Sequence, residues 1–125
     1  MKKIISTSNA PKAVGPYSQA VEANGFLFLS GQVPLNPATG ALVEGGIEAQ
    51  TEQVLKNMEA ILKEAGLSFE NVVKTSCFLA DINDFQSFNA IYATRFTENQ
   101  PARSTFQVGK LPLGALVEIE AIAAK

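Results

Sequence analysis

Residues 45–66, GGIEAQTEQVLKNMEAILKEAG, predict the central helix of this protein. Their apolar side chains recur at steps of three and four residues, so they form one stripe along a helix. These side chains are Ile47, Val54, Leu55, Met58, Ile61, Leu62 and Ala65. Gly45 and Gly46 precede the stripe, and Gly66 is a typical C-terminal cap. We therefore expect a helix over Ile47–Ala65 with one buried face.

A second segment, downstream of the first, has the same helical spacing. It runs from Asp84 to Phe96, and Asp81 or Asn83 could cap its start. Its apolar face consists of Phe85, Phe88, Ile91, Tyr92 and Phe96. The sequence thus predicts two amphipathic helices.

Strands are expected on both sides of these helices. Tyr17–Ala23 and Phe26–Val33 flank Asn24-Gly25, a strong signal for a tight hairpin. The other expected strands are Asn71–Ala80, Ala102–Val108 and Ala115–Ala123, with a short one at Lys3–Ser6. This order predicts one α+β domain over residues 1–125, with two helices packed on one face of a mixed sheet.

The sheet face opposite the helices has no predicted cover. In Phe26–Leu29 large apolar side chains point to both sides, because successive residues of a strand alternate faces. In the last strand Val117, Ile119, Ala121 and Ala123 suit the helix side, and Leu116, Glu118, Glu120 and Ile122 share the other side. Only 18% of residues are charged. We therefore expect copies of the chain to associate through this face, with the glutamates near subunit boundaries.

The composition argues against several kinds of site and partner. There is no histidine and one cysteine, Cys77, so a histidine-based triad, a zinc site and an intrachain disulfide are not expected. A magnesium site made of carboxylates alone stays open. The net charge is −2 with no basic run, which argues against nucleic acid. No apolar run follows Met1-Lys2-Lys3 or is long enough to span a membrane, so we expect a cytoplasmic protein without membrane contact.

Arg103 is the first candidate for chemistry, because it opens an apolar strand in a chain with only two arginines. Its guanidinium offers a planar fork that matches a carboxylate. An ion pair or a solvated strand end is the alternative reading. Glu118 and Glu120 lie on one face of an apolar strand, so either they are exposed at an edge or one is a half-buried general base.

Four further residues are weaker candidates. Tyr17 follows the turn residues Gly15-Pro16 and has core packing as its default reading. Gly31, after Ser30, would let a ligand approach the backbone, whereas Ser30 has no histidine to activate it as a nucleophile. Asn89 is polar beside apolar neighbours, so it could cap, pair or touch a ligand.

Several motifs, in this order and spacing, resemble the RidA/YjgF family of reactive-intermediate deaminases. They are NAP at 9–11, GPYSQA at 15–20, SGQVP at 30–34, DINDF at 81–85, NAIY at 89–92, PARS at 101–104 and EIEA at 118–121. The resemblance implies a chorismate-mutase-like fold and a homotrimer with a cleft at each subunit interface. It also implies hydrolysis of 2-iminopropanoate, 2-iminobutanoate and related enamines to 2-oxo acids, without a cofactor or metal.

The resemblance also implies residue roles. Arg103 matches the arginine that binds the substrate carboxylate, Glu118 the glutamate assigned to the water, and Tyr17 the family tyrosine. Ser30, Gly31 and Asn89 match pocket-lining positions. Thr105 lies at another such position, where many relatives have cysteine. Two other functions stay open: a module that binds 2-oxo acids or fatty acids without turnover, and RNA cleavage, against which the acidic charge and missing histidine argue.

Overall fold

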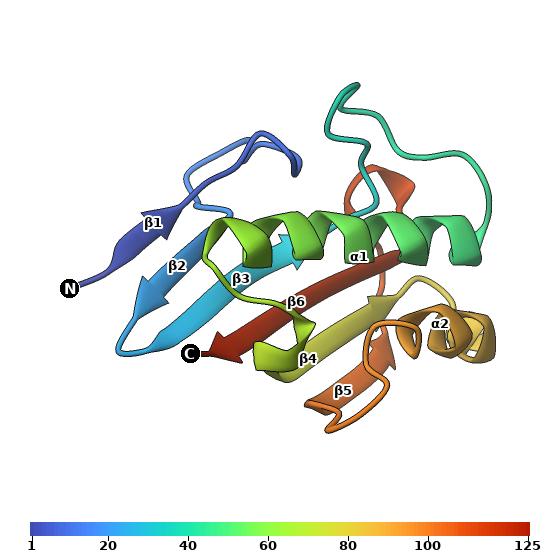
Figure 1. Cartoon of the computed structure of the whole chain (residues 1–125). Coiled ribbons are helices and arrows are strands. Elements are labelled where there is room, and N and C mark those ends of the chain that lie inside the picture. Colours follow the sequence, from blue (N-terminus) through green and yellow to red (C-terminus); the bar gives the residue numbers. More distant parts are fainter.

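The six strands form one mixed sheet in the order β1-β2-β3-β6-β4-β5 (Figure 1). All 125 residues are described by this computed structural model. The strands are β1 (Lys3–Ile5), β2 (Ala20–Ala23), β3 (Phe26–Gln32), β4 (Val72–Leu79), β5 (Ala102–Gln107) and β6 (Val117–Ala124). The helices are α1 (Ile47–Glu64) and α2 (Phe85–Tyr92), with short 3-10 turns at Phe69–Asn71, Ile82–Asp84 and Pro112–Gly114. The predicted α+β class and mixed sheet are confirmed.

The strand pairings explain why the sheet is mixed. Strand β4 pairs in parallel with β5, and every other pairing is antiparallel. The β2–β3 hairpin turns at Asn24 and Gly25, whose φ angles are 52° and 81°. Positive φ at both central residues is characteristic of the type I′ turn that an Asn-Gly pair favours. The predicted hairpin is therefore present, although β2 begins at Ala20 rather than at Tyr17.

Helix α1 follows its sequence pattern closely. Its apolar stripe is buried, and the chain leaves the helix through Gly66 with φ of 76°. The backbone N–H of Leu67 donates to the carbonyl of Leu62, and that of Gly66 donates to the carbonyl of Lys63. These two bonds form a Schellman motif, which satisfies carbonyl groups that a helix end leaves free.

Helix α2 is shorter than the sequence predicts. It ends at Tyr92, not at Phe96, and the residues before Phe85 form a separate 3-10 turn capped by Asp81. The hydroxyl of Thr94 donates to the carbonyl of Ile91 at 2.6 Å and so binds an acceptor of the last helical turn. Phe96 is still buried, because the chain after the helix turns back over the core. The apolar spacing therefore located the buried residues correctly but extended the helix too far.

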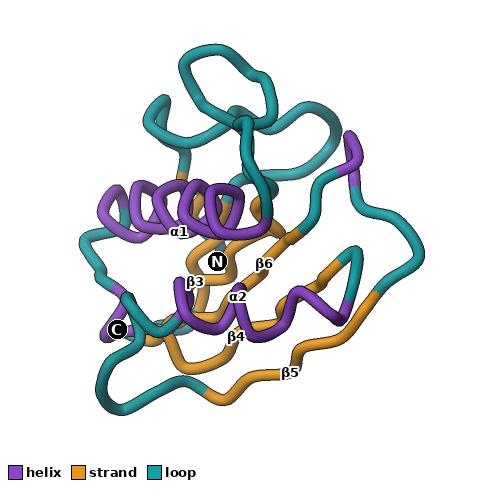
Figure 2. Tube along the Cα trace, turned by 90° about the vertical axis from the view of Figure 1, so that its right-hand side faces the viewer, coloured by secondary structure: helices purple, strands orange, loops and turns teal.

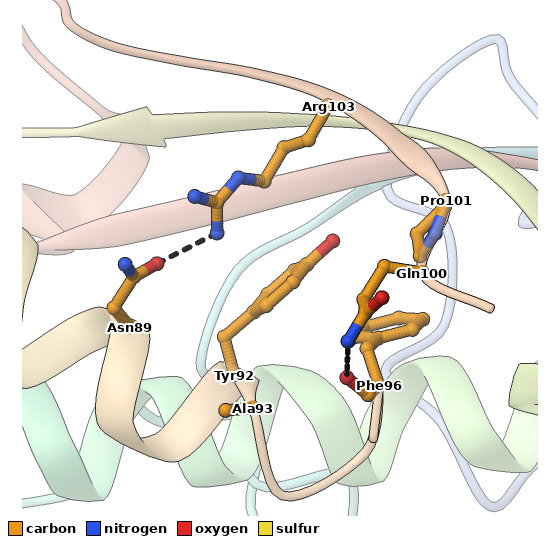
Figure 3. A pocket seen from close by; sticks show the side chains of 7 residues that line it. All are labelled: Asn89, Tyr92, Ala93, Phe96, Gln100, Pro101 and Arg103. Carbon is orange, nitrogen blue, oxygen red and sulfur yellow. Dashed lines mark hydrogen bonds between the residues drawn. The ribbon is translucent and has the colours of Figure 1, made fainter. Parts of the chain in front are cut away.

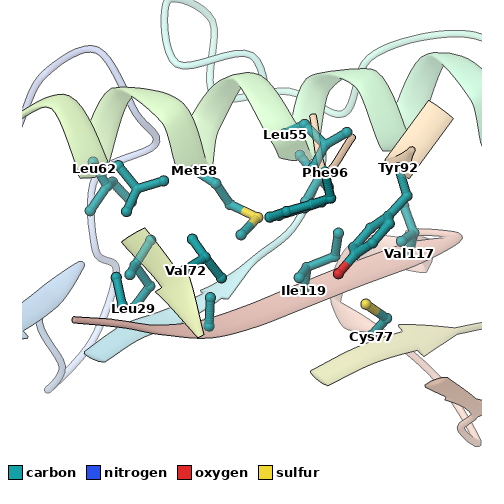
Figure 4. Close-up of a cluster of buried hydrophobic side chains, with 14 of the residues drawn as sticks. Leu29, Leu55, Met58, Leu62, Val72, Cys77, Tyr92, Phe96, Val117 and Ile119 are labelled. Atoms are coloured by element: carbon teal, nitrogen blue, oxygen red, sulfur yellow. The ribbon is translucent and has the colours of Figure 1, made fainter. Parts of the chain in front are cut away.

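The hydrophobic core lies between the sheet and the two helices (Figure 4). Side chains from α1, including Leu55, Met58 and Leu62, point toward the sheet, where Leu29, Val72 and Ile119 lie. Cys77 of β4 is buried there without a disulfide, and burial raises the pKa of its thiol to about 11. Both helices lie on the same side of the sheet in Figure 2. No helix is long and apolar enough to cross a membrane.

The other side of the sheet, here called the open face, has no covering element. Residues paired across neighbouring strands point to the same side, and the pairing series Ile4–Val21–Phe28–Ile122 crosses four strands on this side. Four large apolar side chains of the open face are exposed: Ile4, Phe26, Phe28 and Phe106. The uncovered apolar face expected from the strand pattern is therefore present.

Candidate functional site

The first cluster of candidate residues surrounds the guanidinium of Arg103 (Figure 3). Arg103 lies on β5, and its Nη1 donates a hydrogen bond of 2.7 Å to Oδ1 of Asn89 on α2. Neither ion pair of the protein, Arg95–Glu52 or Lys125–Glu22, involves Arg103. Its positive charge therefore has no carboxylate partner within the chain.

Aromatic rings of α2 lie beside the same guanidinium. Its Cζ is 4.7 Å from the ring centroid of Tyr92, 5.5 Å from that of Phe85 and 6.0 Å from that of Phe88. All three distances lie within the range of a cation–π contact. Tyr92 is buried, and its hydroxyl forms a hydrogen bond of 2.8 Å with the hydroxyl of Thr75 on β4.

A cavity of about 430 Å³ opens beside this cluster. Asn89, Tyr92 and Arg103 line it together with residues of the segment between α2 and β5, which include Gln100 and Pro101. Its walls thus combine one cation, amide groups and aromatic surface, a combination suited to a small organic anion.

The second cluster combines Gly31 and Glu118 at the end of β3 and the start of β6. A Cβ atom placed on Gly31 would clash directly with Oε2 of Glu118. Glycine at this position therefore lets the carboxylate keep its place, whereas a larger residue would force the Glu118 side chain to move. Ser30 lies next to it, and its hydroxyl donates a hydrogen bond of 2.6 Å to the carbonyl of Ser18.

Glu118 is half-buried, and this location changes its acidity. Burial raises the pKa of Glu118 above the ordinary value for glutamate, and the neighbouring carboxylate of Glu120 raises it further. Glu120 itself is exposed. A carboxylate with a raised pKa is a stronger base once it is ionised.

The two clusters lie on opposite faces of the sheet. Arg103 pairs with Thr75, which pairs with Ala121, and this row points to the helix side. Glu118 pairs with Phe78, which pairs with Phe106, and this row points to the open face. The structure therefore brings Arg103 together with Asn89, and Glu118 together with Gly31, but it separates the two clusters within one chain.

The remaining candidates differ in their surroundings. Tyr17 is half-exposed, and its hydroxyl accepts a weak hydrogen bond of 3.4 Å from the N–H of Val14. It is therefore not packed in the core, which was the simplest interpretation of its sequence context. Thr105 lies two residues after Arg103 in β5, so the two side chains point to the same side of the sheet. The hydroxyl oxygen of Thr105 is buried and has no hydrogen-bond partner. No group of three or more Cys, Asp or Glu side chains is placed to hold a metal ion.

Sequence reasoning gave no site role to Tyr92 or Thr75. The helical spacing identified Tyr92 only as part of an apolar face, and the family motifs that contain Tyr92 and Thr75 carried no role for either residue. Their contact joins residues of two different elements, so no local pattern records it.

Comparison with known proteins identifies the family. The family model described as Endoribonuclease L-PSP matches residues 7–125. The chain belongs to this family. The Endoribonuclease L-PSP family includes the Rid proteins, so the resemblance to RidA/YjgF is confirmed.

Relatives within the Endoribonuclease L-PSP family match nearly the whole chain. The mouse protein named 2-iminobutanoate/2-iminopropanoate deaminase is 54% identical over 123 residues, covering 98% of this chain and 91% of its own length. The crystal structure of a Rid family protein from Yersinia pestis is 54% identical with a TM-score of 0.96, and the match covers 100% of both chains. E. coli TdcF, crystallised with bound serine, is 42% identical with a TM-score of 0.92 and 98% coverage of both chains.

Proposed function

We propose that the protein hydrolyses 2-imino acids and their enamine tautomers to 2-oxo acids and ammonia, as a homotrimer with its active sites between subunits. One observation carries this proposal: a chain holds two chemically complementary clusters on opposite faces of its sheet. One cluster offers an unpaired cation, and the other offers a half-buried carboxylate with a raised pKa. Each is half of a site for an anionic substrate that must react with water.

The open face supports the assembly. Exposed phenylalanines and an isoleucine on this face would leave an apolar patch in water unless another copy covers it. A contact that places the Arg103 cluster of one copy against the Glu118 cluster of the next joins two different surfaces. Such a head-to-tail contact forms a ring when the rotation between copies closes, and the family resemblance implies a ring of three copies.

In this proposal Arg103 binds the carboxylate of the substrate. Asn89 accepts one N–H of the guanidinium, which leaves the other donors of the fork for the ligand. The same hydrogen bond orients the amide of Asn89 so that its NH₂ group is free to donate as well. The side-chain end of the substrate would then occupy the apolar part of the cleft.

Glu118 acts on water in this proposal. An imine carbon is electrophilic, and water adds to it as Glu118 takes one of the water protons. When the imine is protonated, this addition gives a neutral amino alcohol. Glu118 then returns the proton to the amine, the C–N bond breaks and ammonia leaves. The hydroxyl proton passes to the Glu118 carboxylate as the C=O bond of the 2-oxo acid forms. Positioning supplies most of the rate advantage, because protonated imines already react readily with water.

Tyr17, Ser30, Gly31 and Thr105 complete the proposed cleft. Gly31 leaves space for the carboxylate of Glu118. The hydroxyl of Ser30 is already bound to a carbonyl, so it shapes the cleft rather than attacking the substrate. Tyr17 presents a half-exposed ring and hydroxyl next to this segment.

The relatives favour this enzyme over the alternatives. Proteins named 2-iminobutanoate/2-iminopropanoate deaminase from mouse and human are 54% and 51% identical to the chain. A binding module without turnover would use the same Arg103 cluster but would not need Glu118. RNA cleavage is supported only by the names of the family and of similar solved structures, and the chain has no histidine and a net charge of −2.

The decisive experiment generates 2-iminopropanoate in situ and measures how fast it disappears. We expect the protein to accelerate its loss, and Glu118→Gln to reduce the rate by roughly 10²–10⁴-fold, as is typical for a lost general base. Glu120→Gln is the matched control, because it removes a carboxylate two residues away that is exposed. No acceleration by the wild type, with intact binding of 2-oxobutanoate, would favour the binding module instead.

A further inference from the structure

The guanidinium of Arg103 lies over a ring that is itself fixed from below. Its Cζ is 4.7 Å from the ring centroid of Tyr92, the nearest of the three neighbouring rings. Tyr92 is only 6% exposed, and its hydroxyl is tied to Thr75, which is completely buried. Thr75 is also the residue that pairs with Arg103 across β4 and β5. The three side chains therefore form one connected unit.

We propose that Tyr92 is a positioning residue: its ring is the platform for the Arg103 guanidinium, and its hydrogen bond to Thr75 holds that platform in place. This inference rests on the proposed role of Arg103 as the carboxylate anchor. It assigns Tyr92 and Thr75 a task that they perform through Arg103.

A platform is needed because Arg103 lacks an acidic side chain as its partner. An arginine side chain has many rotamers, and ordering it on binding costs free energy unless it is already held. An acidic partner would hold it but would also neutralise the charge that binds the substrate. The hydrogen bond to Asn89 and the face of Tyr92 hold the guanidinium without neutralising it.

The tether to Thr75 keeps the ring face, rather than its edge, beneath the cation. The face of an aromatic ring carries the partial negative charge that attracts a cation, so the orientation of the ring matters. Burial raises the pKa of the Tyr92 hydroxyl, with the Thr75 hydrogen bond opposing it, so the phenol stays neutral at physiological pH. The platform therefore adds no charge of its own to the site.

The chain has a natural reference for testing this idea, because its only other arginine is Arg95. Arg95 is held by Glu52 through hydrogen bonds from both terminal nitrogens, with no ring over it. A spectrum of the arginine side-chain Nε–Hε groups should therefore show two resonances, of which only that of Arg103 is displaced by the Tyr92 ring current. We expect Tyr92→Leu to remove this displacement and to leave Arg95 unchanged.

Binding of 2-oxobutanoate supplies the second measurement. Tyr92→Leu should weaken binding by about 2- to 30-fold, the range spanned by a cation–π contact. Tyr92→Phe and Thr75→Val each remove the same hydrogen bond but keep a ring, so both should give a smaller and similar loss. Phe69→Leu is the control. Its ring packs on Phe96 and is not one of the three rings beside Arg103, so this variant should bind like the wild type.

The outcomes separate the two proposals. An unmoved Arg103 resonance and wild-type affinity in a folded Tyr92→Leu protein would overturn the platform. If that variant does not fold, Thr75→Val decides in its place: an unchanged resonance and affinity would also overturn it. A resonance that moves as expected in a protein whose wild type does not bind 2-oxobutanoate would support the platform and refute the carboxylate site.

Discussion

Mixing two inactive variants tests whether Arg103 and Glu118 act across a subunit boundary. Because the two residues lie on opposite faces of one chain, each proposed site takes Arg103 from one subunit and Glu118 from its neighbour. Arg103→Lys keeps the charge but loses the fork, which should cost on the order of 2–5 kcal/mol in transition-state binding. Glu118→Gln should cost roughly 10²–10⁴-fold in rate. Each variant alone should therefore be nearly inactive.

A random one-to-one mixture of these subunits should regain activity. For any site, half of the subunits supply an intact arginine and half of the neighbours supply an intact glutamate, so about one quarter of the sites are complete in a closed ring. The assay is imine loss after the two variants, with different tags, are unfolded and refolded together, and native mass spectrometry verifies that mixed trimers form.

The control mixes Arg103→Lys with the double variant that carries both substitutions. No subunit then supplies an intact arginine, so activity should stay at the level of the single variant. If the first mixture forms mixed trimers and also stays at that level, the shared site is refuted.

Three further predictions concern the same sites. Gly31→Ala should displace Glu118 and strongly reduce turnover while the trimer stays intact, whereas Gly109→Ala, where a Cβ has open space, should turn over like the wild type; equal activity of the two would contradict the close approach to Glu118. Glu120→Gln removes a charge that raises the pKa of Glu118. Glu118 must be ionised to act as a base, so the fall of kcat/KM on the acid side of the pH profile should move to lower pH. If this part of the profile does not move, another group controls it. Light scattering at low micromolar concentration should find trimers, and a well-folded monomer there would refute both the burial of the open face and the shared site.

Much of the fold follows from local patterns in the sequence. The stripe in Ile47–Glu64 needs one buried face whatever it packs against, and Asn24-Gly25 adopts the positive φ angles of its turn from its own chemistry. The alternation in Val117–Ala124 likewise defines one apolar side of the last strand. The apolar spacing was a poorer guide to the end of α2. The helix ends at Tyr92, although the spacing continues to Phe96.

The sequence alone also selected Arg103 and Glu118 as candidates, by their rarity among apolar neighbours and by family motifs. It left open where they lie relative to each other. That is decided by the register of β4 against β5 and β6, because a shift of one residue would move every side chain to the other face.

Contacts between distant residues were likewise decided only by the tertiary structure. Asn89 meets Arg103 across 14 positions of sequence, and Tyr92 meets Thr75 across 17. The approach of Gly31 to Glu118 joins β3 and β6, which are far apart in the sequence. Helical and strand periodicities state which face of an element is apolar, but only the packing of α2 on the sheet places an aromatic ring and an amide beside one guanidinium.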